Sequence, residues 1–169
     1  MRVGLLADTH DRVPAVAELV ARLQSGGVGM ILHTGDYCSP FSLAPLHDAQ
    51  VALAGIFGRN DGDHEGIRAV ASRAVGSELY ESPHSFSLDG RRILMLHELS
   101  EAMERSVEGH DIVIHGCTHR ADVSERGATL LVNPGEACGW LHGVPSAAIL
   151  DLETRQVEMV RLSDPHWRY

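Results

Sequence analysis

The sequence predicts an α/β fold in which two β-sheets pack together and helices cover the outside. Apolar runs of strand length alternate with helical patterns through residues 1–74, which is typical of a layered α/β domain. Residues 85–162 contain mostly strand patterns. Polar residues that can hold a metal ion follow five of the apolar runs. These three observations place the chemistry at the strand ends of an α/β domain.

The first half of the chain begins with an apolar run over residues 2–7. It alternates little between apolar and polar residues, which predicts a central strand buried on both faces. Residues 14–23 then place four apolar side chains at helical spacing and stop before Gly26 and Gly27, which predicts a helix with a defined end. The alternation continues with strands at 30–33 and 51–57 and helices at 41–47 and 65–74.

The second half is predicted to be rich in strands. Asp89 and Gly90 separate two strand patterns at 85–88 and 91–96, a strong signal for a two-residue hairpin turn. A helix is predicted over residues 98–107. The remaining predicted strands cover 112–114, 121–125, 129–132, 147–150 and 157–162.

Length and composition limit the function classes. The chain has 169 residues, 44% of them apolar, which predicts one globular domain over residues 1–169. No apolar stretch approaches the ~20 residues that span a bilayer, and the N-terminus lacks a signal-peptide pattern, so we expect a cytoplasmic protein with no membrane partner. The three cysteines are widely spaced, which favours reduced thiols. A formal net charge of -9 argues against binding to a nucleic-acid polymer.

Five short polar clusters carry the candidate ligands: Asp8-Thr9-His10, Gly35-Asp36, Gly58-Arg59-Asn60-Asp61, Leu96-His97 and Gly116-Cys117-Thr118-His119. Side chains two positions apart on an extended segment point to the same side, so Asp8 and His10 can reach one cation, as can Cys117 and His119. The Asp36 carboxylate can bridge two cations about 3.5–4 Å apart. Any one cluster also fits an ordinary turn or surface histidine. Together they predict a site for two hard or borderline cations.

These motifs resemble those of the calcineurin-like metallophosphoesterases, and within them a small bacterial and archaeal phosphodiesterase group that includes the retromer scaffold subunit. The resemblance implies a four-layer α/β/β/α sandwich of two mixed sheets flanked by helices. It also implies two divalent ions, most often manganese, with zinc, iron or nickel in some members. By motif, it assigns Asp8, His10, Asp36 and His119 to the first metal, with Asp36 bridging, and His97 to the second.

The sequence departs from this family at Arg59, where the family has a metal-binding asparagine directly after the glycine. Arginine is permanently protonated and cannot bind a cation. Two alternatives stay open. The loop can shift by one residue so that Asn60 supplies its amide oxygen, or Arg59 can replace metal charge beside the substrate phosphate.

A second departure is Cys117, which stands where the family has a histidine, and a thiolate there would favour softer ions such as zinc or iron(II). The third is Glu98, which follows His97 in place of a glycine. Glu98 either accepts an imidazole N–H or begins the helix at 98–107. Asp61 is expected either to orient a ligand histidine or simply to form a turn with Gly62.

The resulting hypothesis is a metal-dependent phosphoesterase in which a hydroxide bridging two ions attacks a phosphodiester. The expected catalytic residues are Asp36, Asp61 and Arg59, and the expected metal ligands are Asp8, His10, Asp36, Asn60, His97, Cys117 and His119. Family members active on monoesters use a histidine of the 58–61 loop as an acid, and none is present here, which favours diesters. The alternative is a weak or inactive protein-binding scaffold of the same fold. The partner expected is a small phosphorylated substrate, and the aromatic tail at 165–169 leaves a homo-oligomer open.

Overall fold

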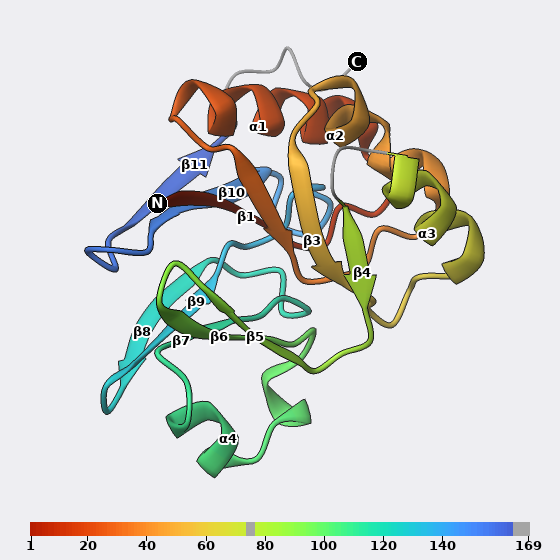
Figure 1. The fold of residues 1–169 in the computed structure, drawn as a ribbon. Helices are drawn as coiled ribbons and strands as arrows, with labels where there is room; N and C mark the ends of the chain where they lie inside the picture. Colours follow the sequence, from red (N-terminus) through yellow and green to blue (C-terminus); the bar gives the residue numbers. More distant parts are fainter. Residues whose placement is uncertain (74–76, 164–169) are drawn as a thin grey trace.

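Two β-sheets face each other in the computed structural model, which describes residues 1–73 and 77–163 (Figure 1). The first sheet has the strand order β11-β10-β1-β2-β3-β4. Its strands are β1 (Arg2–Leu6), β2 (Met30–His33), β3 (Ala52–Ile56), β4 (Glu78–Tyr80), β10 (Ser146–Asp151) and β11 (Val157–Arg161). The second sheet has the order β5-β6-β7-β9-β8. Its strands are β5 (His84–Leu88), β6 (Arg91–Met95), β7 (Ile112–Ile114), β8 (Asp122–Arg126) and β9 (Thr129–Asn133).

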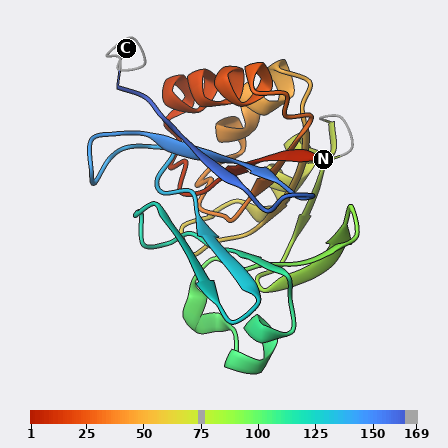
Figure 2. The ribbon, with the colours of Figure 1, turned by 90° about the vertical axis from the view of Figure 1, so that its left-hand side faces the viewer.

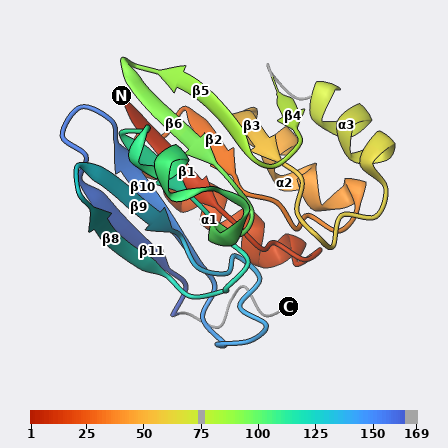
Figure 3. The same ribbon diagram turned by 90° about the horizontal axis from the view of Figure 1, so that it is seen from below.

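Helices cover the outer face of each sheet, which gives four layers (Figure 2). The first sheet carries α1 (Val13–Ser25), α2 (Ala44–Asp48) and α3 (His64–Arg73), with a short 3-10 helix at Pro40–Leu43 before α2. The second sheet carries α4 (Glu104–Glu108) and a 3-10 helix at Leu99–Glu101 (Figure 3). None of the helices in the described ranges has the length and apolar character needed to cross a membrane.

Three apolar clusters fill the spaces between the four layers. The first lies between the helices and the first sheet and includes Leu19 and Ile31. The second lies between the two sheets and includes Leu5 and Ile114. The third lies beneath α4 and includes Val113. Neighbouring residues of one strand thus enter different clusters, which explains why the central strands are apolar throughout rather than alternating.

Both sheets are mixed, and each contains a parallel set. Strands β1, β2, β3 and β4 are parallel, with β10 antiparallel to β1. Strands β6, β7 and β9 are parallel as well, and β5 and β8 pair antiparallel at the edges. Parallel strands end at the same edge of a sheet, so the loops that follow them lie side by side. The predicted class of two mixed sheets with flanking helices is confirmed.

Several predicted elements need correction. The helix predicted over 98–107 is wrong as a continuous element, because Ala102 and Met103 are extended and separate the 3-10 helix from α4. This break allows Leu99 and Ala102 to pack on the same apolar cluster as Val107. Strand β4 was not predicted, because only three residues pair with β3. Residue 74 of the predicted 65–74 helix and the aromatic tail at 165–169 lie outside the described residues.

Candidate metal centre

The predicted ligands lie together at the strand ends of both sheets. Asp8 follows β1, Asp36 follows β2, and the 58–61 loop follows β3; His97 follows β6, and the 116–119 loop follows β7. Two groups of possible ligand atoms that consist of predicted ligands alone form there, each with all its atoms within 4.8 Å of one another. We call them the first cluster (Asp8, His10 and His119) and the second cluster (Asp8, Asp36 and His97).

The backbone is strained where it carries these ligands. Five of the predicted ligands have φ between 40° and 65°, the left-handed region that non-glycine residues rarely adopt: Asp8, His10, Asp36, Cys117 and His119. Such conformations persist only where the surrounding structure holds them, and they concentrate at functional sites. Here the turn immediately after each strand aims the side chain into the space between the sheet ends.

Asp36 lies at the centre of the arrangement. Its Oδ2 atom is 3.5 Å from His10 Nε2 and 3.5 Å from His97 Nε2. Gly58 packs directly against it, and a Cβ at that glycine would collide with Asp36 Oδ1, so the neighbouring loop approaches closely only because residue 58 has no side chain. The Asp36 carboxylate is thus shared between histidines that come from different sheets.

The histidines point defined nitrogens at the carboxylates. His97 Nδ1 lies 2.8 Å from the Thr34 carbonyl oxygen and donates its proton there, so Nε2 is the nitrogen that faces Asp36, and in the neutral ring it carries the lone pair. His119 Nδ1 lies 2.9 Å from the Glu136 carboxylate, and its Nε2 lies 4.0 Å from Asp8 Oδ1. His10 Nδ1 lies 3.2 Å from Cys38 Sγ. In each case Nε2 is the nitrogen directed into the centre.

Buried polar atoms without partners test whether this arrangement fits metal ions. Asp8 Oδ2, His10 Nε2 and His97 Nε2 are buried and have no hydrogen-bond partner among the described residues. Leaving a buried polar atom unsatisfied costs about 1–3 kcal/mol, so three of them in one place need an explanation. Carboxylate oxygens and imidazole nitrogens are ligands of hard and borderline divalent ions. The donor set therefore fits divalent metal ions.

Burial and proximity shift the pKa values at the centre in opposite directions. Burial raises the pKa of Asp8 to about 6, although His119 and His97 partly oppose it. Burial also acts to raise the pKa of Asp36, but the nearby His97 imidazole and the hydrogen bonds from Asn60 outweigh it and hold that pKa well below its usual range. Burial would lower the pKa of His97, yet the interaction with Asp36 raises it to about 9. Asp36 is therefore the permanently charged carboxylate of the pair.

The 58–61 loop directs its three polar side chains to different places. The Asn60 amide lies 2.8 Å from Asp36 Oδ2, and the Asn60 backbone N–H donates to Asp36 Oδ1. Arg59 instead points outward, pairs with Glu98 and has a side chain 63% exposed. The structure brings Asn60, and not Arg59, into contact with Asp36. Glu98 contacts Arg59 and also caps the 3-10 helix Leu99–Glu101, so of the two roles expected for it the structure shows the start of a helix, although that helix ends before Ala102.

Asp61 fixes the register of this loop. Its Oδ2 accepts the backbone N–H groups of Gly58 and Asp36 at 2.7 and 3.2 Å, and its Oδ1 accepts that of Cys38 at 2.8 Å. These bonds join the loops after β2 and β3, so Asp61 does more than form a turn with Gly62. It contacts the backbone of Asp36 rather than a ligand histidine.

Cys117 meets the centre through its backbone, whose N–H donates to Asp8 Oδ1 at 3.3 Å. Its sulfur belongs to none of the ligand clusters found within residues 1–73 and 77–163, and burial raises the pKa of its thiol. The role of Cys117 as a ligand stays a prediction. Two contacts were missed from the sequence, namely Cys38 beside His10 and Glu136 beside His119. Glu136 follows the buried strand β9 and an Asn-Pro-Gly turn, which is the same kind of signal that identified the other clusters.

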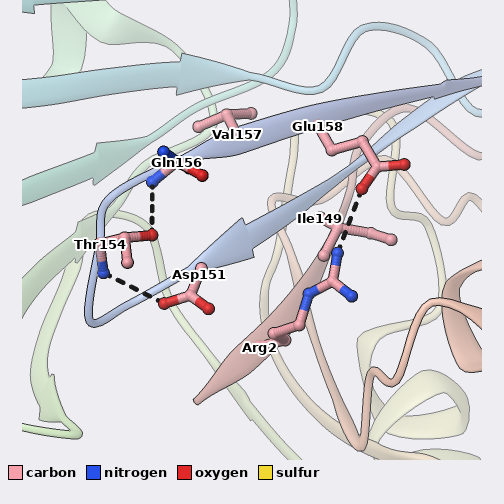
Figure 4. Close-up of a pocket in the computed structure, with 7 residues that line it drawn as sticks. All are labelled: Arg2, Ile149, Asp151, Thr154, Gln156, Val157 and Glu158. Carbon is pink, nitrogen blue, oxygen red and sulfur yellow. Dashed lines mark hydrogen bonds and ion pairs between the residues drawn. The ribbon is translucent and has the colours of Figure 1, made fainter.

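A separate hollow of about 410 Å³ lies far from these ligands along the first sheet, at the hairpin between β10 and β11 (Figure 4). Arg2 and Glu158 form an ion pair across it at 3.1 Å, and Asp151 and Thr154 close its turn. Arg2 begins β1, whereas Asp8 follows the other end of that strand. None of the predicted site residues lines this hollow, which is a feature of the hairpin and not of the metal centre.

Comparisons with known proteins identify the family of this chain. The sequence model of the calcineurin-like phosphoesterase superfamily domain matches residues 1–155. A phosphodiesterase of Methanocaldococcus jannaschii is 26% identical over 165 residues, which cover 96% of this chain and 99% of that protein. A probable metallophosphoesterase of Methanothermobacter thermautotrophicus is 28% identical over 177 residues, covering 98% of this chain and 95% of that protein.

Solved structures show the same fold. An archaeal phosphodiesterase superposes with a TM-score of 0.88 at 26% identity, covering 96% of this chain and all (100%) of that one. Zinc-complexed Vps29 of Entamoeba histolytica superposes with a TM-score of 0.65 at 19% identity, covering 96% of this chain and 98% of that one, a likeness of fold alone. The expected resemblance is confirmed, and the chain belongs to the calcineurin-like phosphoesterase superfamily of hydrolases.

Proposed function

We propose that the chain hydrolyses small phosphodiesters at a centre that holds two divalent metal ions. The observation that carries this proposal is the set of buried, unpartnered atoms Asp8 Oδ2, His10 Nε2 and His97 Nε2 around the Asp36 carboxylate. These atoms lack partners within the described part of the protein, and all of them are metal ligands by type. A scaffold without metal would have no physical use for such an arrangement.

Each residue has a role that follows from its position. Asp8, His10 and His119 would hold one ion, and His97 with the Asn60 amide would hold the other. Asp36 would be shared, because its Oδ2 faces His10 and His97 at equal distances of 3.5 Å. When bound, the two ions would supply an activated water near neutral pH and neutralise charge on the phosphoryl oxygens.

The loop after β3 favours Asn60 as the ligand. The Asn60 amide already contacts Asp36 Oδ2 at 2.8 Å, and a rotation of the amide would present its oxygen at the same place. Asp61 holds the loop in this register through three backbone N–H groups. Arg59 lies at the surface beside Glu98 and would contact an anionic substrate rather than a metal ion.

Two arguments favour diesters as the substrates. The 58–61 loop contains no histidine to protonate a poor leaving group, and diesters with good leaving groups need no such acid. The relative from Methanocaldococcus jannaschii, which matches 96% of this chain, is named a phosphodiesterase. Manganese is the ion we propose, because carboxylate, amide and imidazole ligands suit it; zinc, iron or nickel would be favoured if Cys117 bound as a thiolate.

The test is elemental analysis of protein purified without chelator, combined with hydrolysis of a chromogenic diester and the matching monoester under added Mn, Fe, Ni or Zn. We expect about two ions per chain and faster turnover of the diester, since two ions bridged by a carboxylate are needed for the proposed chemistry. Asp36→Asn serves as the inactive control. Turnover of neither ester with any metal would overturn the proposal and favour a binding scaffold of the same fold.

A further inference from the structure

Glu136 is a buried carboxylate beside the centre that the proposed reaction does not use. It follows β9, so it lies at the same sheet edge as His97 and His119, and its side chain is 1% exposed. Its Oε2 accepts the backbone N–H of Leu141 at 2.9 Å and lies 2.9 Å from His119 Nδ1. Its Oε1 accepts the backbone N–H of His142 at 2.5 Å. An ionised carboxylate buried in this way needs such donors.

The contact with His119 has a direct consequence for the first cluster. A carboxylate can only accept a hydrogen bond, so the 2.9 Å contact requires the proton of neutral His119 to be on Nδ1. The lone pair is then on Nε2, the nitrogen that faces Asp8. The same contact fixes the rotation of the ring, which stacks on His10 at a centroid distance of 5.1 Å.

The three ligand histidines differ in what supports their outer nitrogen. His97 donates to a backbone carbonyl, that of Thr34, and His10 faces the thiol of Cys38. Of these three, only His119 has a carboxylate beside its outer nitrogen, Nδ1. A negatively charged acceptor of the Nδ1 proton makes Nε2 a stronger metal donor than a neutral acceptor does. His119 is therefore the best supported imidazole of the three.

Glu136 could instead bind an ion itself, since its carboxylate, His119 and Cys138 Sγ also lie within 4.8 Å of one another. The hydrogen bonds argue against this. Both Glu136 oxygens already accept backbone N–H groups, and Cys138 Sγ donates to Oε2 at 3.5 Å. An ion at this place would have to displace those donors, so the cluster is a hydrogen-bonded support.

We propose that Glu136 is a positioning residue, which holds His119 in its metal-binding tautomer and orientation and thereby strengthens binding of the ion at the first cluster. This inference rests on the proposed metal centre but not on the identity of the substrate. Glu136 also ties the 139–144 loop to His119, because its other hydrogen bonds go to Leu141 and His142. A purely structural role would consist of that loop contact alone.

The first experiment needs no substitution. Two-bond proton–nitrogen NMR of the metal-free protein, labelled with ¹⁵N-histidine, reports the tautomer of each imidazole at a pH where histidine is neutral. We expect His119 to carry its proton on Nδ1, with its signals assigned by their loss in His119→Gln. A proton on His119 Nε2 would overturn the inference. This measurement does not depend on turnover, so it can fail or succeed separately from the proposed function.

The second experiment measures metal affinity by competition with a chromogenic chelator. In Glu136→Gln we expect one of the two ions to bind about 10- to 100-fold more weakly, the usual effect of losing such a carboxylate, while the other is unchanged. Glutamine is neutral and has a single accepting oxygen, so the negative charge beside His119 Nδ1 is lost and the backbone N–H groups on the two Glu136 oxygens can no longer all be accepted. Glu136→Asp keeps the charge and should restore part of the affinity. Glu158→Gln, which removes one exposed carboxylate far from the centre, is the matched control.

The outcomes separate the alternatives. Wild-type affinity for both ions in Glu136→Gln, with the tautomer of His119 unchanged, would overturn the proposal. Equal loss of both ions together with loss of cooperative unfolding in Glu136→Gln would indicate a structural role, unless Glu136→Asp folds and still weakens one ion selectively. If the wild-type protein binds no ion but His119 carries its proton on Nδ1, the metal centre fails and the positioning contact stands.

Discussion

The two clusters of the centre are built differently although they share Asp8. The first cluster (Asp8, His10 and His119) uses imidazoles whose outer nitrogens face side chains, Cys38 and Glu136. The second cluster (Asp8, Asp36 and His97) relies on one imidazole, supported by a backbone carbonyl, and on a neighbouring loop that supplies an amide. Two of the three sequence departures, Arg59 and Cys117, stand at positions that the family resemblance assigns to the second metal.

This difference teaches that one side of a candidate metal centre can keep its set of ligand residues while the sequence of the other side changes. Asp61 allows the residue at position 59 to change, because its hydrogen bonds to the backbone of Asp36, Cys38 and Gly58 hold the 58–61 loop in place. The residue at position 59 can then turn outward to Glu98 without moving the loop. We expect the first cluster to bind its ion more tightly than the second.

Asp36→Asn should have the largest effect, because Asp36 faces histidines of both clusters. Loss of a shared carboxylate removes several kcal/mol of transition-state stabilisation, which corresponds to about 10³-fold in rate. Metal-dependent hydrolysis of the chromogenic diester and the metal content should both fall. Retention of two ions at full affinity would show that Asp36 is not shared.

The stability of the chelated, metal-free protein should fall as the pH rises. The pKa of His97 is raised from 6.5 to about 9, so its protonated form stabilises the folded chain below pH 6.5 and that contribution is lost between pH 6.5 and 9. The change is at most about 3 kcal/mol in the free energy of unfolding.

Urea unfolding at several pH values measures this slope, and His97→Asn should flatten it. His10 and His33 have lowered pKa values, so they oppose the trend near pH 6.5, where the unfolded chain still protonates them, and contribute little at higher pH. A free energy of unfolding that is constant between about pH 7.5 and 9 would contradict the raised pKa of His97.

Asn60→Ala and Arg59→Ala form a matched pair of neighbours that sharpens the comparison. Asn60→Ala should weaken binding of the ion at the second cluster by about 10- to 100-fold. A direct ligand should contribute at least as much to affinity as a residue that only supports a ligand. Arg59→Ala should leave both ions in place and raise only KM for the anionic substrate, because Arg59 is held at the surface by Glu98. Chelator competition and steady-state kinetics separate the two effects. The reverse pattern would assign the catalytic role to Arg59 beside the metal.

Cys117→His should have the smallest effect and should act only on the second side. The left-handed φ of 65° at Cys117 resembles the 60° of His119, so a histidine fits the backbone there. An added imidazole should raise manganese affinity at the weaker site by up to about 10-fold. Titration with manganese monitors this change. Stronger binding at the tighter site instead would show that residue 117 belongs with His119.

The sequence could predict the fold because hydrophobic periodicity reflects burial directly. The apolar runs before Asp8, Asp36 and His119 predicted strands, and parallel strands necessarily end at one edge, so the convergence of their ligands followed. Strand β4 and the break at Ala102 could not be predicted, because three residues give no periodicity and the break depends on packing against the second sheet. Glu136 follows the strand β9, as the other candidate residues follow theirs, but nothing in the sequence near it indicates that it contacts His119.

By itself, the sequence determined the α/β class, the strand-end positions of the candidate ligands and the superfamily, because each depends on local pattern and motif order. Tertiary structure alone decided which of Arg59 and Asn60 faces Asp36, since adjacent residues differ only in how the loop is held and Asp61 holds it from a distance. It also decided that Glu136 meets His119, across 17 residues of chain. Contacts of this kind depend on how strands from separate parts of the chain align, and no local pattern specifies that alignment.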